Sequence, residues 1–129
     1  MPAISTKDCM EQFGHWSGPA LFDVLRLAYE SRCAEPAAAL KLARLHSQIL
    51  HYAFAGQWDP RWRRERELGD ALIASQLRRS AYDAANARAL HELSQIVDAK
   101  FRASPRTLKA YRKALAALRE RLDPLKLAA

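Results

Sequence analysis

The sequence predicts an all-α protein, folded as a compact bundle of about five amphipathic helices. Ala and Leu, both strong helix formers, account for 43 of the 129 residues. Val, Ile and Thr are scarce, and because strands favour such β-branched residues, no sheet is expected. Apolar residues also recur at steps of three and four along several segments, which is the spacing of one helical face. At this length, one main domain with its own core is expected.

Proline positions, caps and apolar spacing divide the chain into an arm and five helices. Residues 1–18 are weakly patterned and contain two glycines and a serine near their end, so we expect an N-terminal arm there. Phe13 and Trp16 are expected to pack back from this arm onto the body. A single helical domain then covers residues 19–129. Its predicted helices span residues 19–33, 36–55, 60–79, 81–102 and 105–122.

Four of these ranges begin with a proline that suits the first turn of a helix: Pro19, Pro36, Pro60 and Pro105. Residues 36–55 are apolar over a broad face, so this helix is expected at the centre of the bundle. The fourth range begins with a capping-box signal, Ser80 followed by Asp83. No Gly or Pro lies near this signal, and therefore 60–79 and 81–102 are either two helices or one long bent helix.

The last helix is the clearest one and also the most basic part of the chain. Residues 100–126 hold nine Lys or Arg and two Asp or Glu, whereas residues 1–99 hold 12 of each kind. The net charge of +7 therefore belongs to the C-terminal part, which contains a basic helix over 104–125. Such a helix attracts polyanions, acidic protein surfaces or anionic membranes, or forms a solvated face. Its apolar seam consists of Leu108, Tyr111, Leu115, Leu118, Leu122 and Leu125.

The sequence contains no group of residues that indicates catalysis or a metal site. His46 and His51 are five residues apart, so they point to different sides of one helix, and Cys9 and Cys33 have no closely spaced partner ligand. Acids stand singly beside basic residues at helical spacing, as surface ion pairs do. Glycine-rich phosphate loops and nucleophile motifs are missing. We therefore expect a non-enzymatic protein with no metal, no cofactor and no small-molecule substrate.

The segment from Trp58 to Arg66 mixes arginine with tryptophan at the start of a helix, and three interpretations remain open. Trp and Arg are favoured in protein interfaces, which makes interface candidates of Trp58, Trp62, Arg63 and Arg66. Alternatively, arginines bind phosphates while bases stack on tryptophan. The candidates for contact with phosphates or an acidic partner are Arg61, Arg64, Arg106, Lys109, Arg112, Lys113 and Arg119. In the third interpretation both tryptophans anchor the core, and the arginines pair with Glu65, Glu67 and Asp70.

These features favour a small interaction or adaptor protein that binds a protein partner or a second copy of itself. The alternative is a nucleic-acid-binding accessory or regulatory factor that uses the basic C-terminal helix, although a glycine-containing recognition-helix turn is missing. No apolar run is long enough to span a membrane, and no basic start followed by an apolar run indicates a signal peptide. The two widely spaced cysteines are expected as reduced thiols, and we expect a cytoplasmic protein.

Overall fold

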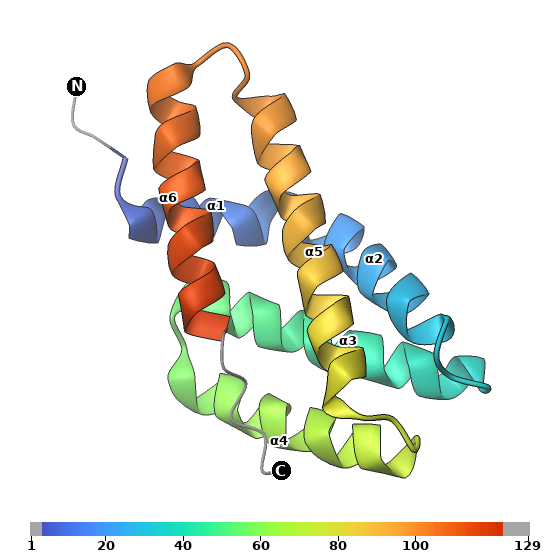
Figure 1. The fold of residues 1–129 in the computed structure, drawn as a ribbon. Coiled ribbons are helices and arrows are strands. Elements are labelled where there is room, and N and C mark those ends of the chain that lie inside the picture. Colours follow the sequence, from blue (N-terminus) through green and yellow to red (C-terminus); the bar gives the residue numbers. More distant parts are fainter. Residues whose placement is uncertain (1–3, 123–129) are drawn as a thin grey trace.

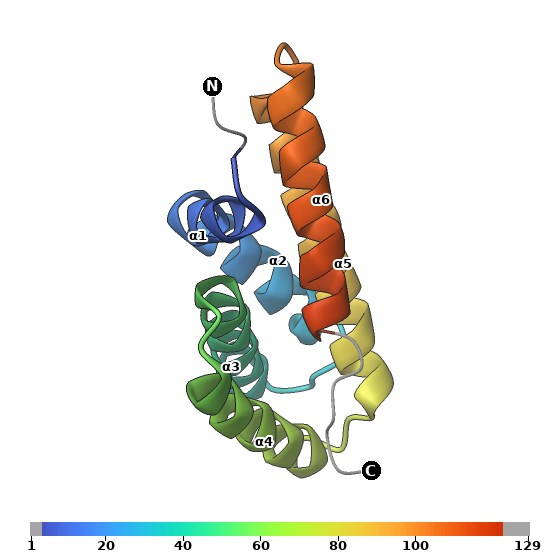
Figure 2. The ribbon, with the colours of Figure 1, turned by 90° about the vertical axis from the view of Figure 1, so that its left-hand side faces the viewer.

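The computed structural model describes residues 4–122, and this part of the chain is all-helical with six helices instead of about five. Figure 1 shows α5 and α6 as a long antiparallel pair, with α1 crossing behind them and α4 beside α3. Figure 2 shows α5 and α6 on one side of the molecule and the other helices opposite them. The helices are α1 (Thr6–Trp16), α2 (Gly18–Glu30), α3 (Pro36–Ala55), α4 (Trp58–Ala74), α5 (Arg79–Lys100) and α6 (Pro105–Leu122).

The additional helix is α1, which occupies most of the predicted N-terminal arm. Ser5 caps it, because the Ser5 hydroxyl accepts a hydrogen bond from the Asp8 amide at 3.1 Å. The sequence predicted a loop here because the helix has only 11 residues, contains Gly14 and is separated from α2 only by Ser17. It nevertheless contributes three buried side chains to the core: Cys9, Met10 and Phe13.

The predicted ranges 60–79 and 81–102 are two separate helices, but the break lies earlier than the sequence indicated. Helix α4 ends at Ala74, and two residues later Gln76 adopts the left-handed conformation with φ of 58°. The Leu77 amide donates to the Leu72 carbonyl at 2.8 Å, which is the closing bond of a Schellman motif. Because this end uses glutamine in place of glycine, it had no recognisable stop signal. Residues 123–125 of the predicted basic helix lie outside the described part of the chain.

Helix α3 is the centre of the bundle, as predicted from its broad apolar face. It packs extensively on α2 and on α4, and it also contacts α1 and α6. Nine of its residues are buried, and among them only His46 is polar. The remaining large contacts join α2 to α5 and α1 to α6, which closes the bundle around α3.

Aromatic side chains join α1 to the α5–α6 hairpin. Phe101 and Tyr111 are stacked with their ring centres 4.3 Å apart, and the Trp16 ring lies 5.0 Å from the Tyr111 ring. Phe13 contacts Tyr111 at 5.7 Å and Trp16 at 5.9 Å between ring centres. The expectation that Phe13 and Trp16 pack onto the body is therefore confirmed.

A hydrogen-bonded chain through fully buried His46 connects three helices. The Tyr29 hydroxyl of α2 lies 2.8 Å from His46 Nδ1, and the Asn86 Oδ1 atom of α5 lies 3.2 Å from His46 Nε2. Because Oδ1 can only accept, the imidazole carries its proton on Nε2 and accepts the Tyr29 proton at Nδ1. The ring also stacks on Tyr82 with 4.4 Å between ring centres. Burial lowers the pKa of His46 to about 4, against a smaller opposing effect of Asn86.

We expect the free energy of unfolding to fall as the pH drops from 6.5 to 4. In this window the unfolded chain, whose histidine titrates near 6.5, binds more protons than the folded one. Above pH 6.5, neutral His46 makes its full contribution to the free energy of unfolding. About 3 kcal/mol of this contribution is lost when the pH reaches 4.

Urea unfolding at pH 7, 5.5 and 4.5 measures this loss. His46→Gln should lower stability at pH 7 but flatten its dependence on pH, whereas His91→Gln, at an exposed position of α5, should keep the wild-type slope. A His46→Gln protein that loses stability as steeply as the wild type would contradict the assignment.

Candidate functional site

Helix α4 carries all four predicted interface residues and lies at the edge of the bundle. Among residues 4–122, α3 is the only helix that packs extensively on α4. Figures 1 and 2 show α4 alongside α3, away from α1 and from the α5–α6 connection. One side of α4 therefore faces α3, and no other helix of the described chain packs extensively on the opposite side.

Three large apolar side chains are exposed on α4. Trp58 is 57% exposed, Trp62 is 37% exposed and Ile73 is 74% exposed. Arg63 and Arg66 are exposed as well, so the structure gathers the four predicted interface residues on one helix. Trp58, Trp62, Arg66 and Ile73 recur at steps of four, four and seven, and we call these four residues the outer face of α4, while Arg63 is exposed on the next side of the helix. The interpretation of both tryptophans as core anchors is wrong, and exposed Ile73 was not among the predicted interface residues.

The inner side of α4 carries a buried ion pair, Arg61 with Glu65. Their Nε and Oε1 atoms lie 3.5 Å apart, and the two side chains are only 5% and 9% exposed. The Arg61 guanidinium carbon also lies 4.2 Å from the centre of a Trp58 ring. Burial lowers the pKa of Arg61 and raises that of Glu65, and each charge partly offsets the shift of the other. Arg61, a predicted phosphate contact, is thus directed to the protein interior.

Spacing along α4 could have predicted this burial. Arg61, Glu65, Leu68 and Leu72 recur at steps of four, three and four, which places them on one helical face. All four are buried. Arg64, another predicted phosphate contact, uses Nη1 to donate to Glu67 at 2.9 Å. The predicted pairing of arginines with Glu65 and Glu67 is therefore confirmed, whereas Asp70 forms no ion pair within 4.0 Å among the described residues.

Some basic side chains of α6 are exposed, and others form polar contacts with neighbouring helices. Arg106, Lys109 and Lys113 are exposed at steps of three and four on one face. Arg112 is held by Asp98 of α5, to which it donates from Nε and Nη2 at 3.2 and 3.1 Å. Arg121, which was not among the predicted residues, donates from Nη1 to the Ala53 carbonyl at 2.6 Å. It thereby satisfies a terminal acceptor of α3.

An open groove of about 660 Å³ lies between the N-terminal half of α5 and the C-terminal end of α6, and Arg119 lines it. Four charged side chains and one histidine surround the groove: Arg79, Asp83, His91, Arg119 and Glu120. Two positive charges face two negative ones, and Arg79 is itself 3.8 Å from Asp83. The charges therefore cancel, which does not favour an anionic ligand.

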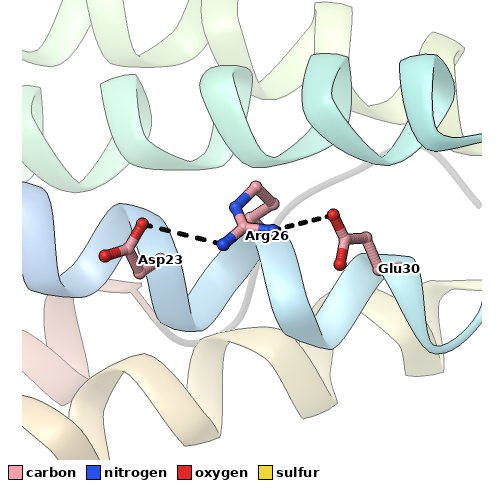
Figure 3. Close-up of polar contacts among 3 residues, drawn as sticks. All are labelled: Asp23, Arg26 and Glu30. Atoms are coloured by element: carbon pink, nitrogen blue, oxygen red, sulfur yellow. Dashed lines mark hydrogen bonds and ion pairs between the residues drawn. The ribbon is translucent and has the colours of Figure 1, made fainter.

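Two acids of α2 form local ion pairs of the same kind. Figure 3 shows Arg26 of α2 between Glu30, 2.9 Å away, and Asp23, 4.0 Å away. Both acids are one helical turn from the arginine, as expected for surface ion pairs. His46 and His51 also separate as predicted, since His46 is buried and His51 is exposed. Residues 4–122 contain no group of three or more His, Cys, Asp or Glu side chains that could hold a metal ion.

Removing the Trp58 side chain should cost little stability. We expect Trp58→Ala to lower the free energy of unfolding by about 1 kcal/mol or less, because the ring is mostly exposed and forms a cation–π contact with Arg61. Phe13→Ala, at a fully buried aromatic position, should cost about 3–5 kcal/mol. Urea unfolding followed by circular dichroism compares the two, and equal losses would contradict the exposed placement of Trp58.

Comparisons with protein-family models, with curated proteins and with solved structures found no match to this chain. None of the helices in the described part of the chain is long and apolar enough to cross a membrane.

Proposed function

We propose that this chain is a non-enzymatic helical interaction protein, and that the outer face of α4 binds a protein partner or a second copy of the chain. The observation that carries the proposal is the exposure of Trp58, Trp62 and Ile73 on a helix that packs extensively on α3 alone among the described helices. Large apolar side chains gathered on one exposed face are typical of protein interfaces.

The energetic support comes from the aromatic side chains. A buried aromatic side chain removes about 150–250 Å² from water, and each Å² of apolar area contributes roughly 25 cal/mol. Covering the exposed parts of Trp58 and Trp62 therefore contributes on the order of a few kcal/mol. Arg63 and Arg66 lie among exposed Asp59 and Asp70, so the charged surroundings of the aromatic side chains have both signs. Such surroundings contribute more to the choice of partner than to affinity.

A second function, binding of nucleic acid by α6, is favoured by one observation. Arg106, Lys109 and Lys113 share a face, and none of them has an ion-pair partner within 4.0 Å among the described residues. The single aromatic residue of α6, Tyr111, is buried, so this face offers phosphate contacts without a surface for base stacking. The proposal for α4 is preferred because Arg61 is buried and Arg64 is paired, which removes two cations from the phosphate-binding set.

Affinity for a purified partner, captured with the wild-type chain, distinguishes the two functions. Trp62→Ala should weaken binding at least about tenfold, because it removes an aromatic anchor. The combined change of Lys109, Arg112 and Lys113 to Ala should weaken it less. Leu27→Ala is the matched control, since Leu27 is exposed on α2.

Unchanged affinity after Trp62→Ala would count against the α4 proposal. Affinity for a DNA duplex that falls steeply with salt, and that the triple change abolishes, would support the second function in its place.

A further inference from the structure

The two connections that flank α4 share a left-handed backbone residue. Gly56 has φ of 68° and Gln76 has φ of 58°, and these are the only positive values of φ in residues 4–122. At both places a Schellman-type bond closes the preceding helix, from the Gln57 amide to the Tyr52 carbonyl and from the Leu77 amide to the Leu72 carbonyl. At each connection the chain changes direction within a few residues. Residues at the ends of helices can act as hinges, because their φ and ψ angles change when the helix rotates.

The N-terminal half of α4 buries two charged side chains and no apolar one. Five residues of α4 are buried, and the three apolar ones, Leu68, Ala71 and Leu72, all follow the ion pair. The first two turns therefore bury only Arg61 and Glu65. By contrast, the neighbouring helix α3 buries eight apolar residues.

The buried pair is incompletely satisfied. Arg61 Nε has no hydrogen-bond partner within the described chain, although Glu65 lies 3.5 Å away, and Arg64 Nε and the Tyr82 hydroxyl are likewise buried without one. The pKa of Tyr82 is raised, mainly by burial. The charge of Glu65 raises this pKa further and the charge of Arg61 lowers it, so the Tyr82 hydroxyl lies within the electric field of the pair. The other charged groups that act here are Arg79 and Asp83 of α5 and Arg121 of α6. An imperfect buried pair gains less from attraction than its desolvation costs.

We propose that α4 is a hinged helix, which opens from α3 as one unit about Gly56 and Gln76, and that the buried Arg61–Glu65 pair determines how often it opens. This inference deepens the proposed function, because the same helix carries the outer face. Once open, α4 also presents Leu68 and Leu72, so that apolar side chains lie on both of its sides. A partner that encloses a single helix in an apolar groove fits such an element.

Hydrogen exchange of the full chain, read by mass spectrometry, tests the proposal without a partner. In the wild type, the slowest amides of α4 should exchange at least about tenfold faster than the slowest amides of α3 and α5. A helix of 17 residues that has left α3 loses the packing that stabilises it, so its own hydrogen bonds break and its amides exchange. Glu65→Gln leaves the Arg61 charge uncompensated, and it should accelerate exchange in α4 by about tenfold more without changing α3.

Replacing both partners by apolar residues should have the opposite effect. Arg61→Met combined with Glu65→Leu removes the desolvation cost and should slow exchange in α4 by at least about tenfold. The matched control is Arg26→Met combined with Glu30→Leu, which has the same four-residue spacing on the exposed side of α2 (Figure 3) and should leave α4 unchanged.

Two results would overturn the proposal: wild-type α4 amides that exchange no faster than those of α3, or an apolar double variant that exchanges as fast as the wild type. Neither result depends on the Trp62 binding experiment, so failure of the hinge and failure of the docking face are distinguishable.

Discussion

A neutral imidazole in the core determines how the central helices are arranged. His46 accepts from Tyr29 of α2 and donates to Asn86 of α5, so both of its nitrogens are satisfied only when α2, α3 and α5 keep their mutual positions. The other three helices are held by different contacts. Aromatic side chains pack α1 against α6, and a hydrogen bond from Arg121 joins α6 to the end of α3. Helix α4 is held by its packing on α3.

Helix α4 differs from the other helices because its polar and apolar sides are partly reversed. Arg61 and Glu65 are inside, whereas Trp62 and Ile73 are outside. Each of these placements is costly for a helix that serves only to complete a core, since charges lose water and apolar groups remain in it. The two costs are explained together if α4 is shared between the bundle and a partner. This combination is why the proposed function and the proposed hinge concern the same element.

Local signals in the sequence were sufficient for most helices but not for the contacts between them. Prolines located the starts of α2, α3 and α6 to within one residue, because a proline in the first turn is a strong local signal. Helix α1 was missed because it is short, and the end of α4 was missed because Gln76 replaces the usual glycine. The partners of His46 lie 17 and 40 residues away in sequence, and no periodicity reveals such pairs. The inward direction of Arg61 was readable from its spacing to Leu68, but arginine by type suggested a surface position.

Covalent footprinting of the chain, free and bound to a purified partner, tests most directly whether function resides on α4. Hydroxyl-radical oxidation reports on Trp58, Trp62 and Ile73, and lysine acetylation reports on Lys109 and Lys113 in the same samples. The account predicts that binding protects the three α4 side chains and leaves the lysines of α6 accessible. Protection confined to those lysines, with unchanged oxidation on α4, would contradict it.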